Sequence, residues 1–189
     1  MKTIYLAAAM ASALSLSSPA SAGFFDFTLA PFVGASVGQS SFDMSCPAGN
    51  SCDDTDTAWK LYGGLEVNEY IQMEFGYADL GEAKISGPDA ATAEVNGVTI
   101  QVIGNLALNP SFSLIGRGGM NILNLEVNAP GYNEGDTDVA WSLGLGAQYN
   151  VTKSLGVRVE WERYFKVGDE DTTGDMDIDL LSAGLVYKF

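Results

Sequence analysis

The side chains best placed for acid–base chemistry in this sequence are Glu160 and Glu162, which stand two positions apart and therefore share one face of an extended strand. Paired carboxylates can act as general acid and general base. The chain has no histidine, which excludes Ser-His-Asp and Cys-His nucleophilic systems. Because Arg158 lies on the same face, ion pairing is the better explanation for the two carboxylates. We predict no catalytic residue and no enzymatic activity.

Further charged residues recur at alternate positions of segments whose other positions are apolar. We predict that they form a lumen ion network, since an unpaired buried charge costs on the order of several kcal/mol. One interpretation is a polar plug that holds the protein together. The other is a gate whose pairs switch and pass ions, because rings of charge also select ions in pores. The predicted members are Lys60, Glu66, Glu74, Arg117, Arg158, Glu160 and Glu162.

The two cysteines, Cys46 and Cys52, are separated by Pro-Ala-Gly-Asn-Ser, which is typical of a turn. Two closely spaced cysteines in an exported chain indicate a small disulfide-closed loop. A metal site would need further cysteines or histidines, and the chain has none. We therefore predict a disulfide, no metal site and no cofactor.

Acidic residues dominate the charge, with 24 Asp and Glu against 9 Lys and Arg and a net charge of −15. Such a surface repels nucleic acid, whose binding requires cations that neutralise phosphates. Most of the acids fall between the alternating segments, and there divalent cations could bridge them to lipopolysaccharide phosphates. Arg163 and Lys166 could meet those phosphates directly. The acids at 171–179 lack the spacing of a calcium-binding loop.

The N-terminus has the pattern of a secretory signal peptide over residues 1–22. Lys2 provides the positive start, an apolar run follows, and Ala20-Ser21-Ala22 is a small-residue cleavage site. The apolar run is shorter than the roughly 20 residues that a transmembrane helix needs. After its removal the chain is expected to consist of one domain, residues 23–189. The protein is expected to cross the inner membrane into the periplasm.

The elements that must position these side chains are strands, because apolar and polar residues alternate with a period of two over most of the remaining chain. Short links are expected at 68–70, 107–111 and 150–154, and long ones at 41–56, 79–94, 123–138 and 166–177. This alternation of short and long connections is typical of outer-membrane barrels. The predicted strands are 28–40, 57–67, 71–77, 95–106, 112–122, 139–149, 155–162 and 181–189.

The fold class predicted from this pattern is all-β, an eight-stranded antiparallel transmembrane β-barrel with up-and-down meander topology. A soluble barrel of the lipocalin kind would also place charges opposite its apolar face. Three observations favour the membrane: the signal peptide, the glycine-rich polar faces, and aromatic residues near strand ends, such as Trp59, Tyr77 and Trp141.

Two stretches and the C-terminus resemble small OmpA-like outer-membrane barrels. The first is Trp59-Lys60-Leu61-Tyr62-Gly63-Gly64 with the Gly76–Gly81 segment, and the second runs from Tyr149 to Tyr164. The resemblance covers essentially the whole mature chain. It implies an integral outer-membrane protein of a Gram-negative bacterium. It also implies insertion by the barrel assembly machinery, which in this family reads a terminal aromatic; here Tyr187 and Phe189 would form that signal.

The chain is expected to end at the barrel, without the periplasmic peptidoglycan-binding domain of larger family members. We therefore expect a monomer that contacts outer-membrane lipid and lipopolysaccharide. Its role would be structural, or would depend on surface interactions made by acidic extracellular loops. The alternative is a narrow gated channel for ions or small solutes.

Overall fold

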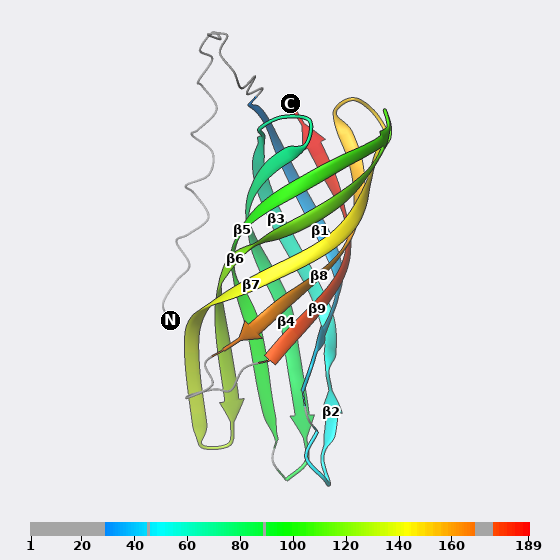
Figure 1. Cartoon of the computed structure of the whole chain (residues 1–189). Helices are drawn as coiled ribbons and strands as arrows, with labels where there is room; N and C mark the ends of the chain where they lie inside the picture. The colour runs from blue at the N-terminus through cyan, green and yellow to red at the C-terminus, as the bar shows by residue number, and fades with distance from the viewer. Residues whose placement is uncertain (1–28, 45, 89, 169–175) are drawn as a thin grey trace.

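The computed structural model describes residues 29–44, 46–88, 90–168 and 176–189, so the predicted signal peptide lies outside the described residues. The described chain is built from β-strands (Figure 1). No helix in these ranges is long and apolar enough to cross a membrane. The strands are β1 Ala30–Phe42, β2 Ser51–Asp53, β3 Thr55–Glu66, β4 Ile71–Ser86, β5 Ala91–Asn109, β6 Phe112–Ala129, β7 Tyr132–Asn150, β8 Leu155–Val167 and β9 Met176–Lys188.

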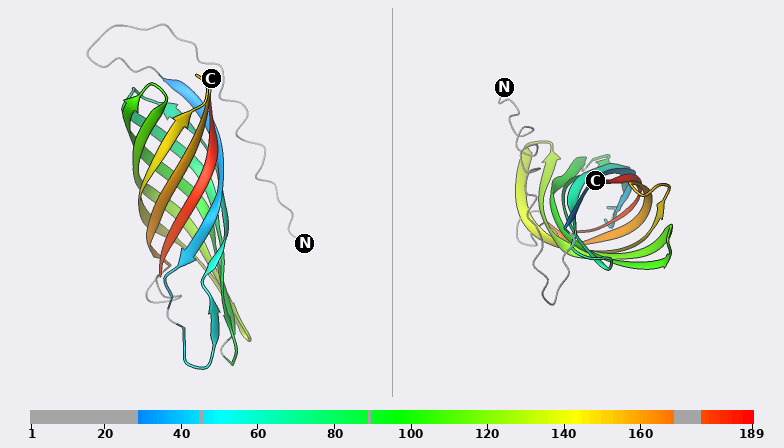
Figure 2. Two further views of the ribbon diagram at one scale, coloured as in Figure 1. Left: turned by 90° about the vertical axis from the view of Figure 1, so that its right-hand side faces the viewer. Right: turned by 90° about the horizontal axis from the view of Figure 1, so that it is seen from above.

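Antiparallel pairing closes the sheet into a ring. Each long strand pairs with the next along the chain, and β1 completes the circle by pairing with β9 from Phe32↔Lys188 to Phe42↔Ile178. Viewed along its axis, the strands form a closed ring (Figure 2). The prediction of an eight-stranded up-and-down barrel is confirmed. The three-residue strand β2 stands outside the ring and pairs only with the end of β4.

The three short turns lie at the end that carries the C-terminus, and they share one local device. A polar side chain at the start of the turn accepts two backbone N–H groups near its end, which replaces ladder hydrogen bonds where the strands reverse. Asn68 accepts from Tyr70 and Ile71, and Asn109 and Thr152 act in the same way. The sequence therefore specifies these turns locally. We call this end the periplasmic end.

Two of the four predicted long loops are mostly strand. β4 and β5 continue until only 87–90 separate them, and β6 and β7 until only 130–131 remain. The predicted loops 79–94 and 123–138 are therefore wrong as loops, because the hairpins extend well beyond the predicted strand ends. They project from the ring at the outer end (Figure 1). The segment before β3 stays largely irregular, apart from β2.

Near the periplasmic end the outward face of the barrel is apolar. Leu143, Leu145 and Leu185 expose 60%, 65% and 55% of their surface. Such exposure of leucine on β7 and β9, on either side of β8, is unfavourable in water and is the pattern of an outward band that meets lipid. Trp59 and Tyr77 pack together at the outer side of this band, with ring centroids 5.7 Å apart. This is where interfacial aromatics are expected.

Farther out, the polarity of the two faces reverses. On β6, Leu123 and Leu125 point into the barrel and are buried, whereas Asn124 and Glu126, which alternate with them, are exposed. On β5, Val95 is buried next to exposed Glu94 in the same way. This is the pattern of a strand that has water outside and packed side chains inside. The reversal therefore marks the outer boundary of the lipid-facing band.

Replacing Leu145 by arginine should test the assignment of the lipid band. A charge on the lipid face near the middle of a barrel costs about 2–4 kcal/mol, whereas Asn128→Arg lies beyond the reversal on exposed β6 surface and should change little. Urea unfolding of both variants in liposomes measures the difference. Equal destabilisation by the two substitutions would contradict the boundary.

Candidate functional site

Six of the seven predicted lumen charges meet in one buried cluster, which we call the six-residue network. Arg117 from β6 donates to Glu74 of β4 at 2.8 Å and to Glu160 of β8 at 2.6 Å. Arg158 also reaches Glu74, at 2.9 Å. The side chains of the network are at most 4% exposed. Its members are Lys60, Glu74, Arg117, Arg158, Glu160 and Glu162.

The network contains three cations and three carboxylates, so its formal charge is zero. Lys60 completes it from β3, with its Nζ 3.0 Å from Glu162 and 3.6 Å from Glu160. Carboxylates that accept from several cations keep most of their lone pairs satisfied, which is the condition under which buried ion pairs are tolerated. The cluster ties β3, β4, β6 and β8 together across the lumen.

Glu66 lies outside this cluster, which departs from the prediction. Its carboxylate pairs with Lys188 of β9 at 2.6 Å, nearer the periplasmic end. Gln72 connects the two groups, since its amide donates to Glu66 at 2.9 Å and its carbonyl accepts from Arg158 at 3.2 Å. Sequence reasoning did not include Lys188, although it stands on the polar phase of the last strand.

Uncharged polar groups extend the network outward. Gln101 donates to Asn121 and to Ser142, both at 2.8 Å. The hydroxyl of Ser142 in turn donates to Glu162 at 2.9 Å. All of these side chains are buried. These charged and polar side chains therefore form one connected hydrogen-bonded system from Glu66 to Asn121.

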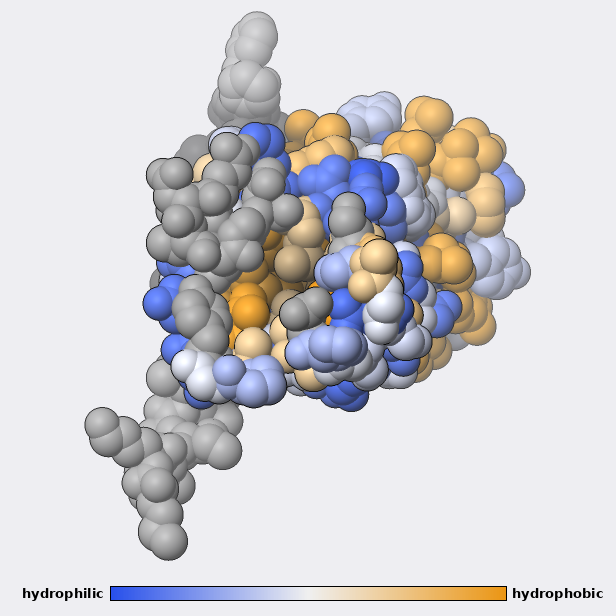
Figure 3. All heavy atoms as spheres, turned by 90° about the horizontal axis from the view of Figure 1, so that it is seen from below, coloured by the Kyte–Doolittle hydropathy of each residue, from blue (hydrophilic) through white to orange (hydrophobic). Residues whose placement is uncertain are grey.

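Beyond this polar layer the lumen is filled by an apolar group, which we call the outer apolar cluster. Hydrophobic residues are visible in the recess between hydrophilic ones when the outer end is viewed directly (Figure 3). Sequence reasoning missed it, because several members lie in segments predicted as loops. Its buried members are Phe42, Ala58, Ala78, Leu80, Ala83, Ala93, Val95, Leu123, Leu125, Ala140, Tyr164, Val167, Ile178 and Leu180.

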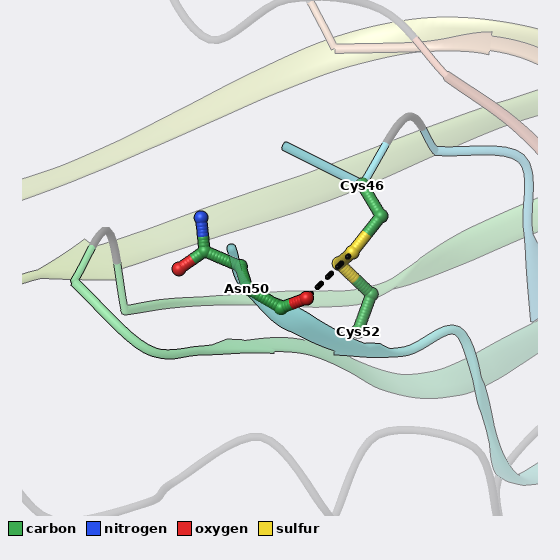
Figure 4. Close-up of a disulfide and its surroundings, with 3 residues drawn as sticks. All are labelled: Cys46, Asn50 and Cys52. Carbon is green, nitrogen blue, oxygen red and sulfur yellow. Dashed lines mark hydrogen bonds between the residues drawn. A yellow bond between two sulfur atoms is a disulfide. The ribbon is translucent and has the colours of Figure 1, made fainter. Parts of the chain in front are cut away.

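The predicted disulfide between Cys46 and Cys52 is confirmed (Figure 4). The two Cα atoms are 5.9 Å apart. Cys52 belongs to β2 and pairs with Ile85 near the end of β4. The bond closes a small loop within the segment before β3, and the pairing of β2 with β4 holds that segment against the projecting β4–β5 hairpin at the outer end of the molecule.

Arg163, one of the two cations proposed to meet phosphates, is already engaged by carboxylates. Its guanidinium donates to Asp177 at 3.0 Å and to Asp179 at 3.1 Å, and Asp43 lies 3.6 Å away. The Lys166 amide also donates to Asp177. These donors hold the pKa of the Asp177 carboxyl below its usual value. The site is thus a carboxylate clamp outside the lipid band.

At the periplasmic end, the rings of Tyr187 and Phe189 meet edge to face with centroids 5.2 Å apart. Both are exposed on the lipid-facing side. Their role as an assembly signal stays a prediction. Within the described ranges no group of three or more Cys, Asp or Glu residues is arranged to hold a metal ion.

Comparison with known proteins identifies relatives along most of the chain. The family model for the OmpA-like transmembrane domain matches residues 30–189. Outer membrane protein A of Shigella flexneri is 28% identical over 167 residues, which are 84% of this chain and 48% of that protein. Its counterpart in Yersinia pseudotuberculosis is 29% identical over 135 residues, 67% and 38% of the two chains. The chain thus spans about half or less of these relatives.

Solved structures share the fold at low identity. Neisserial surface protein A gives a TM-score of 0.62 at 14% identity, covering 84% of this chain and 97% of that one. OprG from Pseudomonas aeruginosa gives 0.56 at 13%, covering 85% and 95%. Ail of Yersinia pestis, in complex with the heparin analogue sucrose octasulfate, gives 0.52 at 14%, covering 85% and 97%.

The match over 30–189, the closed barrel and the lipid-facing band agree with one another, and they confirm the resemblance and the location in the outer membrane of a Gram-negative bacterium. This chain belongs to the family of OmpA-like transmembrane domains.

Proposed function

We propose that this protein is a closed, non-enzymatic outer-membrane anchor that presents an interaction surface at its outer end. The main support for the proposal is that two layers of side chains fill the lumen. The six-residue network fills the middle and the outer apolar cluster fills the outer part. An eight-stranded barrel is just wide enough for side chains to fill, and here both layers are buried.

The absence of enzymatic activity is part of the proposal. Glu160 and Glu162, the only carboxylate pair with catalytic spacing considered above, are held by Arg117 and Lys60. A general acid or base must reach a substrate proton, and side chains 0–1% exposed offer no approach. Their geometry supports a structural role.

The outer end supports the surface-interaction role. Its projecting hairpins carry exposed acids, and the excess of acids over bases is large. The structure of Ail noted above holds a sulfated polyanion. Because the outer end of this chain is acidic, it would repel such a polyanion, and we expect it to select cationic partners instead.

Lipopolysaccharide and the barrel assembly machinery remain proposed partners. Since Arg163 is engaged by Asp177 and Asp179, a direct phosphate contact there would have to displace a carboxylate. Divalent cations bridging the acidic rim to lipopolysaccharide phosphates are therefore the favoured route. The exposed ring of Phe189 is available to the assembly machinery.

A gated channel is the second candidate, and one observation favours it. Lys60 lies between two carboxylates, 3.0 Å from Glu162 and 3.6 Å from Glu160. A small rotation could exchange its partner and rearrange the network. The outer apolar cluster opposes conduction, because an ion would have to cross a dehydrated layer.

Removing the central cation should show how strongly the network holds the barrel. Arg117→Ala leaves Glu74, Glu160 and Glu162 with too few partners, and breaking a buried pair in this way costs about 3–5 kcal/mol. Arg163→Ala, at the solvated outer clamp, should have a clearly smaller effect. Urea unfolding in liposomes measures both. Equal losses would mean that the lumen charges are not the main tie between strands.

Single-channel conductance in planar bilayers separates the two candidate functions. The refolded native protein should be silent, as should a Glu74→Gln/Arg117→Gln variant in which the apolar cluster is intact. Discrete openings of the native protein that change in this variant would instead establish the gated channel. Correct folding of each sample is checked by circular dichroism before the recording.

A further inference from the structure

Within the part of the chain that the structure describes, the outer part of β7 is an open sheet edge. On one side, β7 pairs with β6 from Tyr132 to Tyr149. On the other side, pairing with β8 reaches no farther than Trp141↔Phe165 within the described residues. Among the described residues, the segment 132–140 therefore has a strand on one side only. In Figure 1 this lower part of β7 forms the margin of the ribbon beyond the end of β8.

The direction of the backbone groups along this edge follows from the ladder. In an antiparallel strand alternate residues direct their N–H and C=O groups to opposite sides. Asn150, an even-numbered residue of β7, donates its N–H to Ser111 beside β6. Odd-numbered residues therefore face the other side, and on the outer segment that is the open edge. Thr137 and Val139 are two of them.

These two amides are already capped, and the caps are acids. The N–H of Thr137 donates to the carboxylate of Asp136 at 2.8 Å, and the N–H of Val139 donates to Asp138 at 2.6 Å. Each cap comes from the preceding residue, so these two amides need no partner strand to be hydrogen-bonded. A carboxylate used in this way can be released when a carbonyl replaces it.

The charge of the hairpin selects the kind of strand that could replace the caps. Residues 123–140 contain four acids, Glu126, Glu134, Asp136 and Asp138, and no lysine or arginine. A second copy of this chain would bring the same charge to the edge and be repelled. An extended segment with a basic residue at every second position would place its cations opposite Asp136 and Asp138, which share one face.

We propose that the 132–140 edge of β7 binds an extended, basic segment of a partner protein by strand addition. Carbonyls of the incoming strand accept the N–H groups of Thr137 and Val139. The released carboxylates of Asp136 and Asp138 then pair with its lysine or arginine side chains. This inference rests on the proposed surface-interaction role and names its site and the chemistry of the partner.

The test uses the refolded mature protein in nanodiscs and a fluorescent peptide in which lysine alternates with threonine. We expect saturable binding by fluorescence polarisation. Removing both edge donors with Thr137→Pro/Val139→Pro should weaken it about tenfold or more, as expected for two lost hydrogen bonds. Proline is tolerated where the missing N–H faces away from the sheet, so the barrel should fold.

Matched controls separate strand addition from simple charge attraction. Asp138→Asn should weaken binding severalfold more than Glu126→Gln, which removes the same charge from β6 of the same hairpin. A peptide with N-methyl groups on alternate amides keeps its charge but cannot pair as a strand, and it should bind much more weakly. Equal affinity of the methylated and unmethylated peptides would overturn strand addition in favour of charge alone.

No binding of the lysine peptide would also overturn the inference, and the acids would then serve only to protect the edge from other strands. This result is distinct from failure of the proposed function, which is decided by conductance of the native barrel. A barrel that neither conducts ions nor binds the peptide would support the proposed anchor function and contradict the binding site on β7.

Discussion

The structure depends on one constraint, that backbone groups in contact with lipid must be hydrogen-bonded within the protein. A sheet meets it only by closing, and here the pairing of β1 with β9 removes both edges. Closure at eight strands leaves a narrow lumen, which side chains must fill. The band of exposed leucines, the buried charges and the apolar cluster all follow from a closed sheet with lipid outside and little space inside.

The contents of the lumen also hold the strands in register. A shift of one residue would turn Glu74, Arg117 or Glu160 toward lipid, at a large cost in free energy. Glycine residues on the lumen wall leave space for the large aromatic and charged side chains. A Cβ on Gly34 would collide with the ring of Tyr62, over which the Arg158 guanidinium lies at 5.6 Å. Small residues on one wall thus make room for the aromatic and charged groups of another.

The strands within the lipid band could be predicted from sequence because their outward residues must be apolar. That requirement gives a period of two and assigns Lys60, Arg117 and Glu162 to the lumen. The ion pairs themselves could not be predicted, because Arg117 and Glu160 are 43 positions apart and their contact depends on the register of several strands. Glu66 shares the lumen phase but lies at a different height, which alternation alone does not specify.

The outer strands escaped prediction because their surroundings change. Beyond the lipid band, water solvates the outward face, so Asn124 and Glu126 alternate with buried Leu123 and Leu125 in the opposite sense. The Asn, Asp and Gly residues near the turns of these hairpins then lead to the prediction of a loop. Such a hairpin can be recognised only when one strand is seen to have apolar outward residues in its first part and polar outward residues in its second part.

The same change of solvent explains why β7 can separate from β8. Among the described residues, pairing ends at Trp141, next to the point where the polarity reverses. Inside lipid an unpaired edge would be prohibitive, but in water it costs little, and Asp136 and Asp138 satisfy two of its amides. The requirement that closes the barrel in the membrane thus ceases at the boundary, and the chain is free to use its backbone for recognition there.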